Sequence, residues 1–386
     1  IHYERIKEEV PGMKKPKKDE KEEGLLDEAV ELLKEEEQKL PSGDETFTSE
    51  EKQTLKLLSE LETETDHAFY LELLKKIVRS CRKFVESKRS EVPLRTLQTL
   101  DRHTKDITRH DVQRRYSKEA FFALGDTKAI TLLIERLVTR IVYNPDDYAA
   151  LFLALGDKAI PVLIADLATR KELKARRRVV DMLARFGEKV LPRIPPYLKD
   201  SRWYVVRNIV ALLGEIKSES SVGSLRAALR HPEPRVRKET IKSLSAIHST
   251  QALEYLIETL QDEDGEIATY CAFALGAMKE PGAVQSLLDA AQKTRHRGLQ
   301  QEAISSLGKI GAQEAVPFLA QILRKWRLFR PESVERAQTS AAIALGEIGG
   351  PDALKALKNG TLSGNKATRD ACWQALEIMD EGLGGV

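Results

Sequence analysis

Apolar residues recur along most of this chain at the three- and four-residue spacing of amphipathic helices. The helical segments are about 12 residues long and alternate with short polar turns. One example is VRKETIKSLSAI (236–247), which is followed by ALEYLIETL (252–260) and then by the polar turn QDEDGE. The pattern predicts pairs of short helices, the first of each pair ending near a glycine or a polar residue.

These helix pairs form a repeat. FFALGDTKAITLLI (121–134) and LFLALGDKAIPVLI (151–164) are closely similar. Equivalent positions follow at spacings of 31, 31, 30, 31, 31, 32 and 38 residues: Gly125, Gly156, Gly187, Lys217, His248, Lys279, Gly311 and Gly349. A short fixed period predicts a stacked array in which each unit buries its apolar stripe against its neighbours.

A small residue recurs near the end of the first helix of each unit. In WYVVRNIVALLGEI it is Gly214, and the equivalent positions are Ser245, Gly276, Gly308 and Gly346. We expect a small side chain here to let the next helix cross closely. A glycine near a helix end also permits the left-handed backbone that terminates many helices.

The N-terminal part of the chain does not follow the repeat. Residues 1–45 are predicted to be an acidic, largely flexible arm with one short amphipathic helix, LLDEAVELLKEEEQKL. Residues 46–110 are predicted to form a helical extension of three helices. The first opens with Thr48 and Glu51 at capping-box spacing, and Pro93 lies in the first turn of the third. The second carries a stripe expected to be buried: Phe69, Leu73, Ile77, Cys81 and Phe84.

Residues 111–386 form the predicted repeat array, with KATRDACWQALEIM (366–379) as its capping helix. The residues that define the repeat are Val206-Arg207 with Leu213-Gly214-Glu215-Ile216, Val236-Arg237, Leu275-Gly276, Leu307-Gly308-Lys309-Ile310-Gly311 and Leu345-Gly346-Glu347-Ile348-Gly349. This pattern resembles HEAT repeats, most of all the short bacterial subtype of phycobilin lyases. The resemblance implies an all-α, armadillo-like, right-handed α-solenoid of about eight HEAT-like helix pairs, and a bacterial protein.

Charge is unevenly distributed along the chain. Residues 1–64 carry 11 Lys and Arg against 20 Asp and Glu, whereas residues 176–238 carry 15 against 6. The three cysteines are far apart, with no C-x-x-C pair, which argues against disulfides and thiolate zinc sites and favours a reducing, cytoplasmic location. We find no apolar run of 18 residues, so no membrane span is expected.

No catalytic or nucleotide-binding motif is present, and we expect no cofactor and no metal. Deoxyhypusine hydroxylase resembles this architecture and binds iron through His-Glu dipeptides, but none of the seven histidines here precedes a glutamate. A subunit of a bilin-lyase-like enzyme remains an alternative, although it rests on the repeat alone. No carboxylate and aromatic constellation of a DNA glycosylase is recognised.

Three features are candidates for partner binding. The first is a basic band, in which Arg177, Arg207 and Arg237, 30 residues apart, are expected to line up. The alternative for Arg207 and Arg237 is an Arg–carboxylate ladder between repeats. The second is an aromatic pair before the Val-Arg dipeptide, and the third is an insertion of about seven residues near 324–337. The candidate residues are Arg176, Arg177, Arg178, Arg202, Trp203, Tyr204, Arg207, Arg235, Arg237, Arg324, Trp326, Arg327 and Phe329.

The favoured interpretation is a non-catalytic scaffold or adaptor that binds another protein, with an acidic segment, through one ridge or groove of the solenoid. The alternative from another class is a nucleic-acid-binding solenoid that uses the basic band 176–238. The acidic arm is either a regulator that competes with the ligand for the basic band or a solubilising tail. If it regulates, deletion of residues 1–45 tightens ligand binding.

Overall fold

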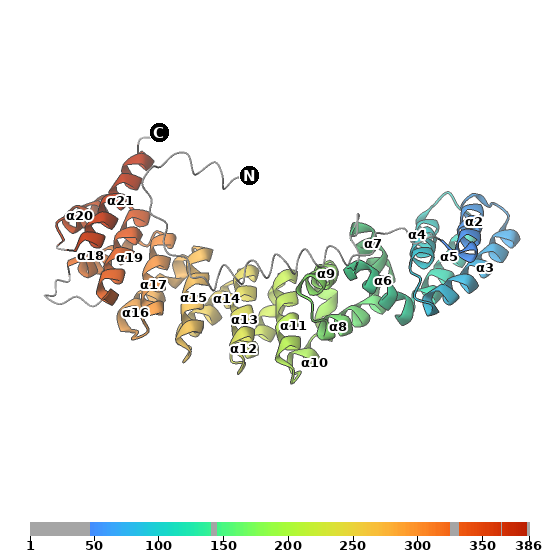
Figure 1. Cartoon of the computed structure of the whole chain (residues 1–386), viewed down its shortest axis with the longest axis horizontal. Coiled ribbons are helices and arrows are strands. Elements are labelled where there is room, and N and C mark those ends of the chain that lie inside the picture. Colours follow the sequence, from blue (N-terminus) through green and yellow to red (C-terminus); the bar gives the residue numbers. More distant parts are fainter. Residues whose placement is uncertain (1–46, 140–144, 325–331, 364, 384–386) are drawn as a thin grey trace. The chain divides into compact units, whose positions relative to one another are not determined.

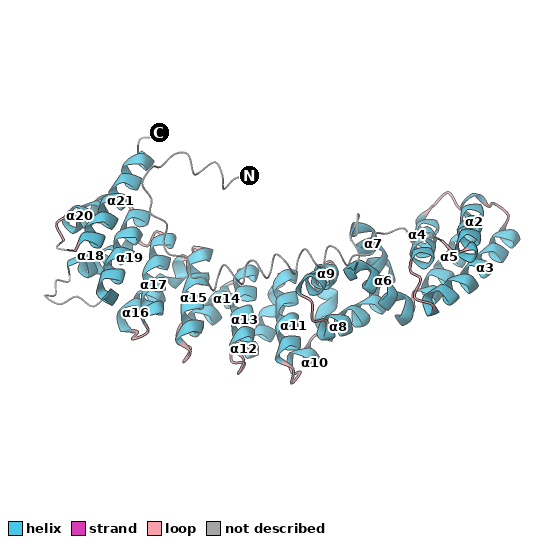
Figure 2. Ribbon diagram, viewed as in Figure 1, coloured by secondary structure: helices cyan, strands magenta, loops and turns pink. Residues whose placement is uncertain are grey.

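The computed structural model describes residues 47–139, 145–324, 332–363 and 365–383, and every regular element in these ranges is a helix (Figure 2). The chain divides into two compact units, Ile1–Leu55 and Lys56–Val386. The domain bounds at 45 and 110 are not tested by this division and stay predictions. The helix expected within residues 25–40 lies outside the described residues.

The first described helix begins with the expected capping box. The Thr48 amide donates to Glu51 Oε2 at 2.8 Å, and the Glu51 amide donates to Thr48 Oγ1 at 3.2 Å. Each side chain therefore satisfies a backbone donor that the first turn leaves without a helical partner. The N-terminal helices are α2 (Ser49–Thr63), α3 (His67–Glu86) and α4 (Glu91–Lys105).

The predicted stripe of α3 is confirmed except at its first position. Leu73, Ile77, Cys81 and Phe84 are at most 4% exposed, but Phe69 is 46% exposed and Tyr70 is fully buried in its place. A helix turns once in 3.6 residues, so a strict four-residue spacing drifts off the buried face within a few turns. The correct face therefore begins one residue later than the sequence pattern suggests.

Eight helix pairs and a final helix follow, which confirms the all-α solenoid (Figure 1). The first helices are α5 (Asp111–Leu124), α7 (Pro145–Leu155), α9 (Leu173–Ala184), α11 (Trp203–Ile216), α13 (Pro234–Ile247), α15 (Gly265–Met278), α17 (Arg297–Ile310) and α19 (Glu332–Ile348). The second are α6 (Thr127–Thr139), α8 (Ala159–Thr169), α10 (Pro195–Leu198), α12 (Val222–Ala228), α14 (Thr250–Thr259), α16 (Val284–Lys293), α18 (Val316–Arg324) and α20 (Gly350–Gly360), before α21 (Lys366–Leu383). Short 3-10 helices precede several second helices: η1 (Gly156–Lys158), η2 (Gly187–Arg193), η3 (Glu219–Ser221), η4 (Pro281–Ala283) and η5 (Gln313–Ala315).

From α9 onward, each first helix packs on the first helix of the next unit. The turn that ends each first helix uses the expected left-handed backbone. Seven of the eight equivalent positions have a φ between 54° and 77°: Gly156, Gly187, Lys217, His248, Lys279, Gly311 and Gly349. Gly125 differs, with a φ of −74°. A Cβ there would meet the end of the Leu155 side chain and would lie 3.1 Å from the Phe121 carbonyl oxygen.

The small residues near the ends of the first helices set the distance between units. A Cβ on Gly276 would lie 2.8 Å from Ser306 Cα, and one on Gly308 would lie 2.7 Å from Ala344 Cα. Gly214 and Gly346 approach the next helix in the same way, as predicted. α13 carries Ser245 at this position, and α15 packs less closely on α13 than α17 packs on α15.

Buried polar side chains also join successive units, which the sequence pattern did not indicate. Ser243 Oγ donates to the Val210 carbonyl at 2.9 Å, and Ser306 Oγ donates to the Ala272 carbonyl at 2.8 Å. Asn208 Nδ2 donates to the carbonyl of Leu167 at 3.1 Å. Each bond satisfies a side chain that neighbouring helices enclose.

The expectation that no segment could span a membrane is wrong for residues Pro145–Thr169. Among the described residues, this one stretch is long and apolar enough to cross a membrane, with a mean hydropathy of 1.6. It comprises α7, η1 and α8, and the positive φ of Gly156 interrupts it. Half of it is buried within the array, where α8 packs against α6, α9 and α11, as a core helix of a helical repeat does.

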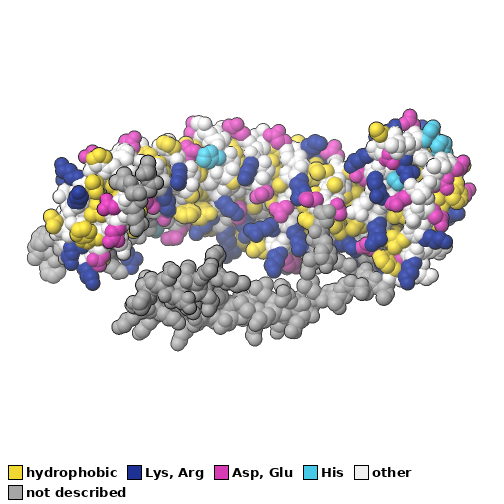
Figure 3. Space-filling view, turned by 90° about the horizontal axis from the view of Figure 1, so that it is seen from above, with side chains coloured by type: hydrophobic (Ala, Val, Ile, Leu, Met, Phe, Trp, Pro, Cys, Tyr) yellow, Lys and Arg dark blue, Asp and Glu magenta, His cyan; other side chains and the backbone are white. Residues whose placement is uncertain are grey.

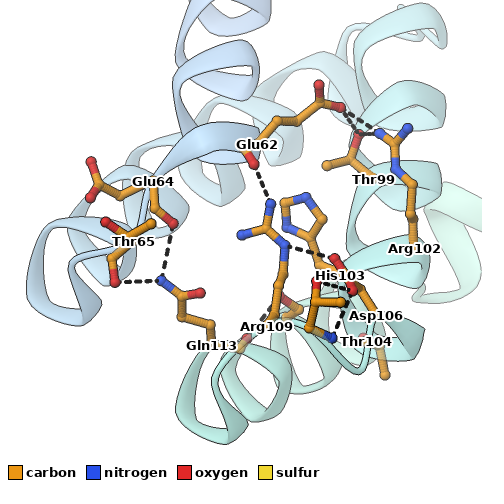
Figure 4. A network of polar contacts seen from close by, with 12 residues as sticks. Glu62, Glu64, Thr65, Thr99, Arg102, His103, Thr104, Asp106, Arg109 and Gln113 are labelled. Atoms are coloured by element: carbon orange, nitrogen blue, oxygen red, sulfur yellow. Dashed lines mark hydrogen bonds and ion pairs between the residues drawn. The ribbon is translucent and has the colours of Figure 1, made fainter.

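A polar network joins helices near the N-terminal end of the unit Lys56–Val386, with Gln113 and Thr99 buried and Glu62 and Arg102 exposed (Figure 4). Gln113 Nε2 donates to the carbonyls of Glu64 and Thr65 at 3.1 and 3.2 Å, and Arg109 donates to the Glu62 carbonyl. Arg102 reaches the Glu62 carboxylate from α4. Together these contacts fix the turn between α2 and α3 against α4 and α5.

His103 takes part in a chain of hydrogen bonds beside this network. Ser117 Oγ donates to the Gln113 carbonyl at 2.9 Å, so it accepts from Tyr70 Oη, 2.6 Å away. Tyr70 Oη then accepts from His103 Nδ1, at 2.8 Å. Burial lowers the pKa of His103 to about 4, and the cations of Arg109 and Arg102 add to this effect against the opposing charge of Asp106.

Candidate functional site

A groove with a volume of about 210 Å³ crosses the first helices of three successive units, α9, α11 and α13. We call it the charged groove, because side chains of both signs line it: Arg176, Arg177, Asp181, Arg207, Glu215, Glu239 and Lys242. In Figure 3, likewise, basic, acidic and hydrophobic side chains are interspersed over the visible face of the molecule. Two of the predicted ladder residues, Arg177 and Arg207, lie in this groove.

Arg176 and Arg207 are half-buried cations of the groove without a carboxylate partner. Arg176 Nη1 donates to the Lys171 carbonyl at 2.7 Å, and Arg207 Nη2 donates to Asn208 Oδ1 at 3.2 Å. Within the described residues, neither guanidinium lies within 4.0 Å of a carboxylate. Burial lowers the pKa of Arg176, and the charge of Arg207 lowers it further, against the opposing charges of Glu239 and Glu172.

Trp203 begins α11 beside these cations. Its ring lies 4.9 Å from the Arg235 guanidinium and 5.9 Å from that of Arg207, measured to the ring centroid. The Tyr204 ring meets it edge-on, with the centroids 6.1 Å apart. A half-exposed indole between two guanidinium groups can bind a planar or apolar side chain while the cations bind an anion.

Other candidate arginines make local contacts within the chain. Arg202 forms a two-pronged ion pair with Asp200 at 2.9 and 2.8 Å, which lowers the pKa of that carboxyl group to about 2. Arg178 Nη1 donates to the Leu137 carbonyl at 2.7 Å and so caps the end of α6. Arg235 is 68% exposed and lies 3.5 Å from the Glu233 carboxylate.

Arg237 does not line up with Arg177 and Arg207. Its side chain is only 13% exposed, and it pairs with Asp264 at 3.0 Å and Asp262 at 3.5 Å, in the turn before the next unit. It lines a separate cavity of about 700 Å³. The Arg–carboxylate alternative therefore describes Arg237 and does not describe Arg207.

The reason lies in the repeat length. Arg177 and Arg207 each precede the left-handed residue of their unit, Gly187 and Lys217, by ten positions. Ten positions before His248 is Lys238, which is exposed, and not Arg237. The spacing between these two units is 31 residues, so counting 30 from Arg207 selects the residue before its equivalent, and on α13 that residue, Arg237, is only 13% exposed.

The C-terminal candidates are described only in part. Arg324 is the exposed last residue of α18, whereas Trp326, Arg327 and Phe329 lie outside the described residues. No group of three or more His, Cys, Asp and Glu that could hold a metal ion occurs in the part of the chain that the structure describes. The free cysteines are buried, and burial raises the pKa of Cys81 to about 11.

Comparison with known families identifies the repeat. Residues 191–270 and 256–335 match HEAT repeats, and residues 337–361 match the PBS lyase HEAT-like repeat. The chain thus carries HEAT repeats, and the predicted resemblance to the phycobilin-lyase subtype is confirmed. A segment of 145 residues is 31% identical to the stalled ribosome sensor GCN1 of Mus musculus and 30% identical to that of Homo sapiens. It covers 32% of this chain and only 5% of the length of these relatives.

Several solved structures are similar to the chain. A Kap121p mutant is 13% identical over 88% of this chain and 41% of its own, with a TM-score of 0.43. An engineered protein is 16% identical over 85% of this chain and 98% of its own, with a TM-score of 0.32. Human deoxyhypusine hydroxylase is 19% identical over 76% of this chain and 98% of its own, with a TM-score of 0.23.

Proposed function

Because the chain carries HEAT repeats, we propose that it is a non-catalytic scaffold that binds a segment of another protein along the charged groove. One observation supports this proposal above the others. Arg176 and Arg207 face the same groove, repel each other, and have no carboxylate partner among the described residues. A carboxylate from a partner would relieve that repulsion, and Trp203 beside it offers an aromatic contact of the kind common at interface centres.

The charge pattern of the groove favours a protein over a nucleic acid. Asp181, Glu215 and Glu239 line it together with the arginines. The sugar–phosphate backbone of a nucleic acid presents a regular series of negative charges and would be repelled by these carboxylates. A protein segment can place charges of either sign where they are needed. We also propose that the protein acts in the cytoplasm.

The test is affinity capture with the full chain as bait, from lysate that has been divided and treated with nuclease in parallel. The double variant Trp203→Ala/Arg207→Glu removes the aromatic contact and inverts one cation. The matched control is Arg226→Glu, because Arg226 also lies over an aromatic ring, 4.8 Å from the centroid of Tyr255, but outside the charged groove.

The proposal predicts a protein that survives nuclease treatment, is retained by the control variant, and is lost with the double variant. Retention by the double variant would refute binding through this groove. Captured material that disappears on nuclease treatment, and whose binding falls steeply with salt, would favour the nucleic-acid alternative.

A further inference from the structure

Besides the arginines, the charged groove contains a pair of carboxylates. Asp181 on α9 and Glu215 on α11 both line it, and neither forms an ion pair within 4.0 Å among the described residues. Burial raises the pKa of Asp181, and the charge of Glu215 raises it further. The cations that face Asp181 from its own helix are Arg177 and Arg185, and Arg185 is held 2.6 Å from Asp146.

The two pairs lie at different levels of the same helices. Counted back from the left-handed residues Gly187 and Lys217, Arg176 and Arg207 are eleven and ten positions away. Asp181 and Glu215 are six and two positions away. At 1.5 Å per residue, the mean separation along the helix axes is roughly 10 Å. At this separation neither arginine forms an ion pair with either carboxylate among the described residues.

The third wall of the groove adds no free charge. On α13, Lys242 lies 3.5 Å from the Glu239 carboxylate, so these two side chains compensate each other. The charged side chains without an ion pair therefore belong to α9 and α11. Those nearer the N-terminal ends of these helices are cationic, and those nearer the C-terminal ends are anionic.

We propose that the groove recognises a protein segment that carries both an acidic and a basic side chain, the acid held by Arg176 and Arg207 and the base by Asp181 and Glu215. This inference rests on the proposed function and deepens it. An extended segment advances about 3.3 Å per residue, so the two side chains are two to four residues apart. Each of them relieves one like-charge repulsion, so a segment with both binds more tightly than a purely acidic one.

The experiment selects displayed random peptides on the full chain, using the native sequence and two double variants. Asp181→Lys/Glu215→Lys inverts the anionic pair, and Arg176→Glu/Arg207→Glu inverts the cationic pair. Asp181→Asn/Glu215→Gln removes the negative charges with little change of shape, so a loss does not depend on the inverted variant alone. Helical circular dichroism confirms that each variant is folded.

We expect the native chain to enrich peptides with an acid and a base two to four residues apart. Binding of the best peptide falls about tenfold or more with the Asp181→Lys/Glu215→Lys variant and returns when the peptide's base is replaced by an acid. The neutral variant gives a smaller loss.

Two other results separate the inference from the function on which it rests. Purely acidic peptides that bind the native chain and the Asp181→Lys/Glu215→Lys variant equally would overturn the inference and leave the proposed function standing. Peptides whose binding is unaffected by Arg176→Glu/Arg207→Glu, or the failure to enrich any peptide, would overturn both.

Discussion

Acidification should destabilise the helices around His103 well before the carboxylates of the chain are protonated. An unfolded histidine has a pKa near 6.5, whereas the pKa of His103 in the folded chain is about 4. The folded state thus binds fewer protons between these two values, so stability is complete above about pH 6.5 and is lost as the pH falls toward 4. Between pH 7 and pH 5 this difference in proton binding lowers the free energy of unfolding by about 2 kcal/mol.

The structural cause is the hydrogen-bond chain from His103 through Tyr70 to Ser117. His103 is 2% exposed, and a second proton on its ring would place a cation near Arg109 and Arg102 without bulk water. Only Asp106, which raises the pKa of His103, opposes this cost among the charged groups that affect it. The exposed position of Asp106 limits its compensation, because solvent screens the pair.

Hydrogen exchange of the α3 and α4 amides measures the effect locally, after correction for the intrinsic pH dependence of exchange. We expect the opening equilibrium constant to rise about 20-fold between pH 7 and pH 5. In His103→Asn, which keeps an N–H donor near the position of Nδ1 but does not titrate, this rise should disappear. His248→Asn is the control, because His248 is 53% exposed and lies in a later repeat. The reasoning is wrong if opening is independent of pH, or if His103→Asn retains the same pH dependence.

Three further predictions concern the joints between repeats. Gly276→Val should lower the free energy of unfolding by more than about 2 kcal/mol, since its Cβ meets Ser306 Cα. Gly223→Ala should raise the free energy of unfolding by about 0.5–1 kcal/mol, because no atom lies within 4 Å of the new Cβ. Thermal unfolding measures both changes. Lys279→Gly should stabilise the chain by about 0.5–1 kcal/mol in urea titration, because its φ of 54° is strained for a side chain; a loss of stability would show that the lysine makes a compensating contact. Arg237→Ala should lower the free energy of unfolding by roughly 2–3 kcal/mol, because it leaves Asp262 and Asp264 without their partner. Arg235→Ala, at a 68% exposed position, should lower it by less than about 0.5 kcal/mol. Equal losses in denaturant titration would contradict the ion pairing of Arg237 with these aspartates.

The repeat, its helix pairs and its turns could be predicted from the sequence because each depends on nearby residues and recurs in successive units. Left-handed turns need a glycine or a residue that tolerates that backbone, and the close approaches need a small side chain, so both leave a periodic trace. Lys217, His248 and Lys279 were found only because their neighbours in the repeat are glycines.

The orientation of individual side chains was less predictable. Phe69 and Tyr70 are adjacent aromatic residues, and only the packing of α3 decides which of them is buried. A count of 30 residues places Arg237 in the groove, whereas the carboxylates of Asp262 and Asp264, which lie far from it in the sequence, hold its side chain elsewhere. The sequence gives no sign that Ser243 and Ser306 bond to a neighbouring helix, because helical serines usually face solvent or their own backbone.

The joint between α13 and α15 has a mechanical consequence. Elsewhere from α11 to α21 a glycine lets neighbouring first helices touch backbone to backbone, but here Ser245 takes its place and its hydroxyl bonds within α13, to the Ile241 carbonyl at 2.8 Å. In a stacked array, stiffness is a property of each nearest-neighbour contact. Between α11 and α21, the α13–α15 joint is therefore the softest, and we expect thermal bending of this stretch to concentrate just beyond the last wall of the charged groove. The α11 and α13 walls of the groove lie on one side of this joint and move together, whereas α9 packs on α11 about as loosely as α15 packs on α13.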